Sequence, residues 1–267
     1  MDTRWERMMA PATHRLIVRL HVLLGLLTVC GEVTVSAGQE APRFLTVAPG
    51  ISHTTFDVRP PDGEPFSGHA FRVDLGEAEL RLVPASGPSP RQTVEQIASP
   101  FPAVVAVNAS FFDNDGRAMG LAVSEGRLVA TGKRASWGAL VISGTDARIV
   151  LGSGISDPLA HRLIIQGIPR LVVGGAVPGL KPQLAERTAV CAAGSRVVIV
   201  VANKAESTAF ARFLAEPSEK TGLGCSDALN LDGGPSTQLV VRLPALTLSL
   251  RGGWGVPNAL VATPGKR

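Results

Sequence analysis

The stretch with the greatest capacity for chemistry is residues 228–238, which read ALNLDGGPSTQ. A strand-forming approach brings Asn230 and Asp232 close together, and two glycines and a proline then turn the chain before Ser236. Glycines allow backbone N–H groups to converge on an anion, and a carboxylate beside them can transfer a proton or hold a cation. An ordinary Asp-Gly hairpin turn is the structural alternative. The clustering of polar and glycine positions favours a binding or catalytic turn.

The same stretch also resembles a nucleophile elbow, because residues 234–238 lack only the final glycine of G-x-S-x-G. In that arrangement the acid and the histidine follow the serine, whereas residues 237–267 contain no Asp, Glu or His. A serine hydrolase built on Ser236 would need partners from scattered upstream loops. The order of residues therefore disfavours this alternative.

Three further polar clusters follow expected strands, where loops rather than the core receive them. They comprise residues 108–116 (NASFFDNDG), residues 166–175 (QGIPRLVVGG) and residues 186–189 (ERTA). The Arg187-Thr188 pair suits a phosphate, because a guanidinium bonds two oxygens and a hydroxyl can reach a third. Taken alone, the first two clusters are more typical of solvated or structural turns, and the third is also compatible with a surface ion pair or an arginine at a strand edge.

The order of these motifs resembles the phosphodiester glycosidase family over roughly residues 70–262. The residues that carry the resemblance are Asn108-Ala109-Ser110-Phe111-Phe112, Gly120-Leu121, Arg187-Thr188-Ala189, Asn230-Leu231-Asp232-Gly233-Gly234-Pro235-Ser236-Thr237 and Pro257-Asn258-Ala259-Leu260. The Asn-Leu-Asp-Gly-Gly block is the most specific of them. The resemblance implies hydrolysis of the glycosyl–phosphate bond of sugar-1-phosphodiesters, such as α-N-acetylglucosaminyl phosphodiesters.

Six residues match site positions of that family: Arg187, Thr188, Asp232, Gly233, Ser236 and Thr237. We expect catalysis from Asp232, Arg187 and Thr188. Substrate binding is expected from Asn108, Asn230, Gly233, Gly234, Ser236 and Thr237. One position departs from the family, since many relatives have a third glycine where this chain has Pro235. Proline lacks a backbone donor, so the anion cradle would depend more on Ser236, Thr237 and Arg187.

Glycoside hydrolysis usually employs two carboxylates. Asp232 is the first candidate, and the second stays open among Asp113, Asp115, Glu186 and Asp227. We expect no cofactor and no metal site, with a divalent cation beside Asp232 as the alternative. The rival function is a non-catalytic protein that binds an exopolysaccharide or another glycopolymer, or assists its export.

The pattern of apolar, polar and glycine residues in the rest of the sequence predicts the fold that positions these residues. Short alternating or apolar segments separated by Gly-rich turns predict many strands, and two helices are expected at residues 93–98 and 207–214, the latter behind a Ser or Thr cap. Residues 70–75 and 79–84 are expected to form a hairpin. Residues 103–107 are apolar on both faces, which predicts a central strand with Asn108 at its exit. The fold class is therefore α+β, a sheet-dominated mixed fold with few short helices in a single compact domain.

The first 37 residues read as a signal peptide, with four arginines, the apolar run at residues 22–27 and a small-residue cleavage site at residues 35–37. Residues 38–66 are expected to form a leader and the first strand, and residues 67–264 the glycosidase-like domain. We therefore expect a periplasmic or secreted protein without stable membrane insertion after cleavage.

Charge and sequence patterns limit the classes of partner that we expect this protein to bind. The formal net charge is +4, and part of it belongs to the signal segment. Because no basic run or helix-turn-helix pattern is present, we expect no nucleic-acid partner, only a small or polymeric sugar phosphodiester. Cys191 and Cys225 either form a disulfide or lie as two small buried hydrophobic residues.

Overall fold

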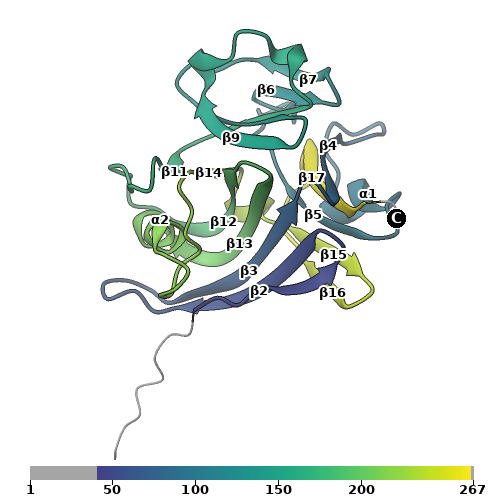
Figure 1. Ribbon diagram of the computed structural model, residues 1–267. Coiled ribbons are helices and arrows are strands. Elements are labelled where there is room, and N and C mark those ends of the chain that lie inside the picture. The colour runs from purple at the N-terminus through teal and green to yellow at the C-terminus, as the bar shows by residue number, and fades with distance from the viewer. Residues whose placement is uncertain (1–40, 266–267) are drawn as a thin grey trace, which may run out of the picture. The chain divides into compact units, whose positions relative to one another are not determined.

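Antiparallel pairing organises residues 41–265, the part of the chain that this computed structural model describes, into three sheets (Figure 1). The expected signal peptide lies outside the described residues. The result is a sheet-dominated α+β domain with two short α-helices, as predicted. Within the described part, no helix has both the length and the apolar character needed to cross a bilayer.

The large sheet contains seven strands and supplies most of the candidate site. Its spatial order is β1 (Leu45–Ala48), β2 (Ile51–Val58), β3 (Phe66–Asp74), β13 (Arg196–Glu206), β12 (Leu184–Ala193), β14 (Ala228–Asn230) and β11 (Arg170–Val172).

Two five-stranded sheets complete the domain. The middle sheet has the order β7 (Arg127–Gly132), β6 (Gly120–Ser124), β10 (Leu163–Gly167), β8 (Gly138–Ser143) and β9 (Asp146–Leu151). The terminal sheet has the order β16 (Leu246–Leu250), β15 (Leu239–Leu243), β5 (Val104–Asn108), β17 (Asn258–Pro264) and β4 (Ala78–Pro84).

The main core lies where the inner faces of the three sheets meet. Phe71 of the large sheet, Ile142 of the middle sheet and Val107 of the terminal sheet all belong to it and are fully buried. Strand β5 shows why an apolar run on both faces predicts a central strand. Its residues Val105 and Val107 enter this core, while Val104 and Ala106 pack on the opposite face, against α1. The prediction for β5 and Asn108 is confirmed.

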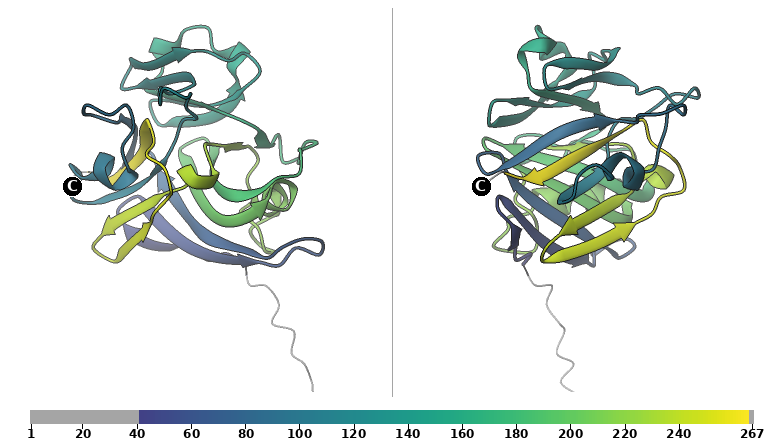
Figure 2. Two further views of the ribbon diagram at one scale, coloured as in Figure 1. Left: turned by 180° about the vertical axis from the view of Figure 1, so that it is seen from behind. Right: turned by 90° about the vertical axis from the view of Figure 1, so that its right-hand side faces the viewer.

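The hairpin expected at residues 70–84 is wrong. Strand β3 pairs with β2 and β13, whereas β4 pairs with β17 in the terminal sheet. The short connection between β3 and β4 therefore carries the chain from one sheet to another (Figure 2). Alternation along each strand identified the strands correctly, but it carries no information about their partners.

Both helices form where the sequence predicts them. Helix α1 (Val94–Ala98) begins with a capping box between Thr93 and Gln96. Helix α2 (Ser207–Ala215) packs its phenylalanines, Phe210 and Phe213, on the large sheet. Its cap is not the expected Ser or Thr. Instead, the carboxylate of Glu206 accepts hydrogen bonds from the first turn, at 2.8 Å from Thr208 N and 2.9 Å from Ala209 N.

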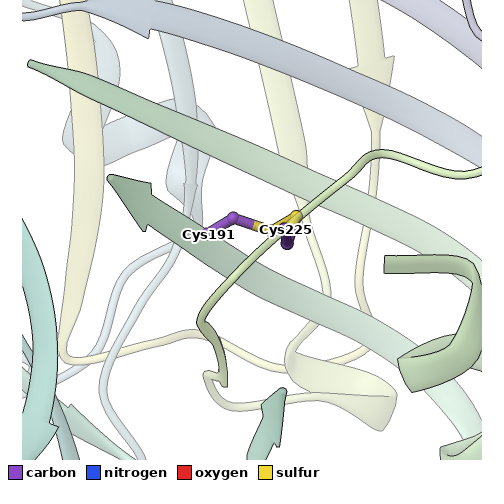
Figure 3. The surroundings of a disulfide bond; sticks show 2 residues. All are labelled: Cys191 and Cys225. Carbon is purple, nitrogen blue, oxygen red and sulfur yellow. A yellow bond between two sulfur atoms is a disulfide. The ribbon is translucent and has the colours of Figure 1, made fainter. Parts of the chain in front are cut away.

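Cys191 on β12 and Cys225 on the loop before β14 form a disulfide, with Cα atoms 5.8 Å apart (Figure 3). Of the two alternatives left open by the sequence, the structure adopts the bond. It fastens the segment that leads into β14 and Asp232 onto the neighbouring strand.

Candidate active site

Asp232 lies where the chain passes from the large sheet to the terminal sheet. Strand β14 ends at Asn230, and β15 begins at Leu239 in a different sheet. The intervening segment contains one 3-10 turn, Gly234–Ser236. The alternative of an ordinary hairpin turn is therefore excluded, because the strands on either side of it do not pair with each other. Asp232 itself is partly exposed and can meet a ligand.

Backbone hydrogen bonds fix this crossover on both sides. Leu231 N donates to Thr188 O at 2.9 Å, and Asp232 N donates to Ala109 O at 3.1 Å. The first bond comes from β12 of the large sheet, and the second from the segment that follows β5 of the terminal sheet. The position of Asp232 is thus set by both sheets.

A buried side-chain network supports the crossover from beneath. The Asn108 amide donates to Asp232 O at 2.6 Å, and its Oδ1 accepts from the Thr188 hydroxyl at 2.7 Å and from Gln238 N at 3.1 Å. We call Asn108, Thr188 and Gln238 the Asn108 hub. All three side chains are almost completely buried. In this structure Asn108 and Thr188 face protein partners and hold the crossover in place.

Two glycines shape the turn above the hub. Gly234 has φ +58°, in the left-handed region that disfavours other residues. Gly233 is needed for a different reason, since a Cβ built on it would lie 2.7 Å from the carbonyl oxygen of Glu186. The Gly-Gly pair therefore allows a left-handed residue and a close approach to β12 in succession.

The backbone amides of this turn are largely committed within the chain. Gly233 N donates to the Asp232 carboxylate at 3.0 Å, Ser236 N to Gly233 O at 3.2 Å and Thr237 N to Gly234 O at 2.9 Å. Pro235 has no N–H to offer. The anion cradle expected from these amides is therefore mostly occupied by protein acceptors in this structure.

Three side-chain oxygens of the same segment differ from these amides, because they have no protein partner. Asn230 Oδ1, Ser236 Oγ and Thr237 Oγ1 are buried and have no hydrogen-bond partner among the described residues. Because native proteins pair nearly all buried polar atoms, three unpaired oxygens on one short segment call for a ligand or water. We call Asn230, Asp232, Ser236 and Thr237 the Asp232 turn.

Burial raises the pKa of Asp232 above its ordinary value, while the Ser236 hydroxyl and the Gly233 amide act in the opposite direction. Ser236 is near enough to favour the ionised carboxylate, yet its hydroxyl makes no hydrogen bond of good geometry. The Ser236 hydroxyl is therefore available to a ligand. A carboxylate with a raised pKa is a stronger base than an exposed one.

Arg187 lies near this turn in the strand register but directs its side chain elsewhere. Its Nε donates to Ala205 O at 3.2 Å, and its Nη2 donates to Ser207 Oγ at 2.9 Å and to Gln183 O. Burial lowers its pKa, and Glu206 partly offsets that effect. Among residues 41–265, no hydrogen bond or ion pair joins Arg187 to Asp232. The structure therefore brings the two backbones together without pairing the two charges.

The four candidates for a second carboxylate are placed very differently. Asp113 and Asp115 serve their own exposed loop, where Asp113 accepts from Arg117 N at 2.9 Å and Asp115 pairs with the Arg117 guanidinium at 2.9 Å. Asp227 accepts a long bond of 3.4 Å from Gly174 N. The backbone of Glu186 borders the turn, because its carbonyl oxygen would lie 2.7 Å from a Cβ built on Gly233.

The described histidines have partners away from Ser236. His161 bonds Ser143 at 2.8 Å, and His53 bonds His69 at 3.1 Å. A serine hydrolase therefore gains no support. In the described part of the chain, no three His, Cys, Asp or Glu side chains gather as metal ligands.

Two further polar residues, Gln238 and Asn258, stand in motifs that the sequence analysis named, but it did not assign them to the site. The Gln238 side chain accepts from Val94 N at 3.0 Å and donates to Trp254 O at 2.8 Å, which ties α1 and the loop before β17 to the turn. Asn258 exchanges two bonds with Ser110, at 2.9 and 3.1 Å. Polar side chains at the ends of apolar strands were the available signal in both cases.

Comparisons with known proteins bear on the family and the fold. Residues 101–263 match the family model for phosphodiester glycosidase. No curated protein matches the sequence. Among solved structures, the catalytic domain of zebrafish N-acetylglucosamine-1-phosphodiester α-N-acetylglucosaminidase, auto-inhibited by its pro-peptide, superposes with a TM-score of 0.64 at 18% identity, over 85% of this chain and 89% of that one.

Two other structures share the fold. A hypothetical protein from Synechocystis gives a TM-score of 0.55 at 17% identity, over 80% of this chain and 62% of that one. A Burkholderia pseudomallei protein described as exported gives 0.51 at 14% identity, over 75% and 74%. Identities this low show the fold alone. The family follows from the model match, which spans more than half of the sequence. This chain belongs to the phosphodiester glycosidase family.

Proposed function

We propose that this protein is an exported hydrolase that cleaves the glycosyl–phosphate bond of sugar-1-phosphodiesters, such as α-N-acetylglucosaminyl phosphodiesters. The observation that carries the proposal is the Asp232 turn. It combines a partly exposed carboxylate of raised pKa with three unpaired buried oxygens. Such a set can accept and donate hydrogen bonds to sugar hydroxyls and phosphate oxygens.

In the proposed reaction, water attacks the anomeric carbon, the bond from that carbon to the phosphate oxygen breaks, and a phosphate monoester leaves. Asp232 removes a proton from the water, a role that its raised pKa favours. The phosphate is a good leaving group, which reduces the need for a strong general acid. The turn hydroxyls of Ser236 and Thr237 hold the substrate as donors to its oxygens.

Of the four candidates, we assign the second carboxylate to Glu186, because it is half-buried and its backbone carbonyl borders Gly233 of the turn. Arg187 is expected to bind the phosphate through one nitrogen rather than two. Its Nε and Nη2 are bound to protein acceptors, so Nη1 is the nitrogen through which it would reach a phosphate oxygen.

Export and a periplasmic or secreted location belong to the same proposal. The disulfide between Cys191 and Cys225 supports it, because such bonds persist in oxidising compartments. The substrate would then belong to an envelope or extracellular glycopolymer, or to a small diester released from one.

The test is hydrolysis of N-acetylglucosamine-1-phosphate methyl diester by the purified protein, and the quantity measured is the release of the reducing sugar. We expect turnover by wild type, a loss of at least about 100-fold in Glu186→Gln, and full activity in Asp113→Asn as the matched control. Binding of the diester without sugar release would instead support a non-catalytic glycopolymer-binding protein. Equal rates in Glu186→Gln and wild type would remove Glu186 from the mechanism.

A further inference from the structure

A small cavity lies beside the disulfide between Cys191 and Cys225. Its volume is about 190 Å³, which is below the range of about 300–1,000 Å³ that is typical of sites for drug-sized ligands. Strands β3, β12 and β13 and the segment between α2 and β14 form its walls, and two arginines, Arg72 and Arg196, line it. None of the residues that line it belongs to the Asp232 turn or to the Asn108 hub.

The strand register explains why two arginines meet in this cavity. Arg72 on β3 lies opposite Val198 on β13, and Arg196 precedes Val198 by two positions on the same strand. Residues two apart project from the same face of a sheet, so both guanidiniums rise from one face of the large sheet. Cys191, the partner of Val198 on β12, projects from this face as well. Thr188 of the hub precedes Cys191 by three positions, so it projects from the opposite face.

The charges of these two arginines are not neutralised by the described part of the protein. None of the ion pairs within residues 41–265 involves Arg72 or Arg196, and no Asp or Glu is among the described residues that line the cavity. Asp74 lies opposite Arg196 in the register, but its carboxylate accepts from Gly76 N at 2.9 Å. Burial lowers the pKa of Arg72, and the charge of Arg196 lowers it further. Two like charges therefore face each other without a counter-charge.

The hydrogen-bond donors of the cavity are free to meet a ligand. The Arg72 guanidinium lies over the Phe44 ring, 4.0 Å from its centre. Stacking on an aromatic ring uses the face of the planar guanidinium and leaves the N–H groups at its edge for hydrogen bonds. Ser218 and Ser226, from the segment between α2 and β14, also line the cavity. Their hydroxyls add neutral donors to the two charged ones.

We propose that this cavity is a binding site for a small dianion of the phosphate type, either the free ion or the end group of a phosphate monoester. Two guanidiniums match two negative charges and donate to several oxygens of one ligand, whereas a single carboxylate would leave one positive charge unmatched. The bound ion links β3 and β13 to the segment that the disulfide fastens onto β12 (Figure 3). This inference does not depend on the proposed function.

Titration with inorganic phosphate at about pH 8, where it is mainly a dianion, tests the site when backbone amide shifts are followed by NMR at constant ionic strength. We expect shifts in residues 191–198 and 218–226, and binding at least about tenfold weaker in Arg196→Gln. Arg196 is exposed, so this variant should fold, and Arg196→Lys should keep part of the affinity. Arg148→Gln is the matched control, because Arg148 is also an exposed arginine on a strand and lies outside the cavity.

Three results would overturn the proposal. Shifts confined to residues 228–238 would place the phosphate at the candidate active site alone, and equal affinity in wild type and Arg196→Gln would remove the arginines from the binding. Acetate, a monoanion, should bind about tenfold more weakly than phosphate, and equal affinities would contradict a dianion site. Glycerol 3-phosphate distinguishes the two sources of the ligand. Binding as tight as that of phosphate identifies the end group of a monoester, loss of binding identifies the free ion, and both results support the site.

Discussion

The Asn108 hub and the Asp232 turn are joined by a hydrogen bond of 2.6 Å, yet they differ in whether their polar side-chain atoms have protein partners. In the hub, both ends of the Asn108 amide are bound to protein groups. In the turn, three buried oxygens have no partner among the described residues. The fold uses the polar groups of the hub and leaves those of the turn for a ligand. Substitutions in the hub should therefore change stability, and substitutions in the turn should change activity.

Arg187 falls on the hub side of this comparison. Its guanidinium connects the carbonyls of Gln183 and Ala205 to Ser207 at the start of α2. A buried arginine with several protein acceptors is part of the scaffold, whatever else it contacts. Because Arg187 is also proposed to reach the phosphate through Nη1, replacing it should lower both stability and activity. An Arg187 variant therefore cannot separate the hub from the turn.

Asp232→Asn should have the largest effect. It removes the proton acceptor and keeps the shape of the side chain, so we expect sugar release from the diester to fall by about 1,000-fold. The thermal midpoint should not fall, because the Asn108 hub is untouched. Activity within tenfold of wild type would contradict the assignment of Asp232 and, with it, the division between hub and turn.

Asn108→Ala should be the most damaging to stability. It removes three hydrogen bonds at a fully buried position and leaves Thr188 and Gln238 without their acceptor. We expect a loss of about 3 kcal/mol in the free energy of unfolding, measured by urea denaturation. Thr188→Val removes a single donor and should cost about 1 kcal/mol. A normal unfolding curve with lost activity in Asn108→Ala would move Asn108 from the hub to the turn.

Part of this arrangement could be predicted from the sequence because it depends on local patterns. The apolar run before Asn108 predicts β5, and the polar and glycine residues around Asp232 predict a functional turn. Which strands pair is not local, so alternation alone placed β3 and β4 in one hairpin. The direction of Arg187 depends on a bulge in β12 and on the position of α2, neither of which residue types reveal. Glu206 as a cap was missed because Ser207 and Thr208 are commoner capping residues.

Gly234→Ala should have a smaller effect that again separates the two regions. Gly234 and Gly144 have φ values of +58° and +57°, and a Cβ on either meets nothing within 4 Å. Alanine at each position should therefore cost about 1 kcal/mol of stability, from the left-handed backbone alone. Only Gly234→Ala should also lower activity, because it lies in the turn whereas Gly144 joins β8 to β9. Equal activity in the two variants would show that the shape of the turn is not critical.

The smallest expected effect is a pH dependence of stability that originates in the turn. Burial raises the pKa of Asp232 above that of the unfolded chain, so the unfolded state loses this proton first as pH rises. The contribution of Asp232 to folding is thus greatest in acid and falls as pH rises through its folded pKa. We expect Asp232→Asn to gain stability over wild type on going from acid to neutral pH, as measured by thermal melting at each pH.

The pH dependence of stability must be compared between wild type and Asp232→Asn, because His53 gives the stability of both proteins a pH dependence of the opposite sign. Burial, together with His69, lowers the pKa of His53 from 6.5 to about 4. Its contribution to stability is present above pH 6.5 and is lost as pH falls towards 4. The contribution of His53 is present in both wild type and Asp232→Asn and cancels in the difference between their stabilities. A difference that stays constant with pH would mean that Asp232 is not held in a desolvated position, and the turn would then resemble an ordinary exposed loop.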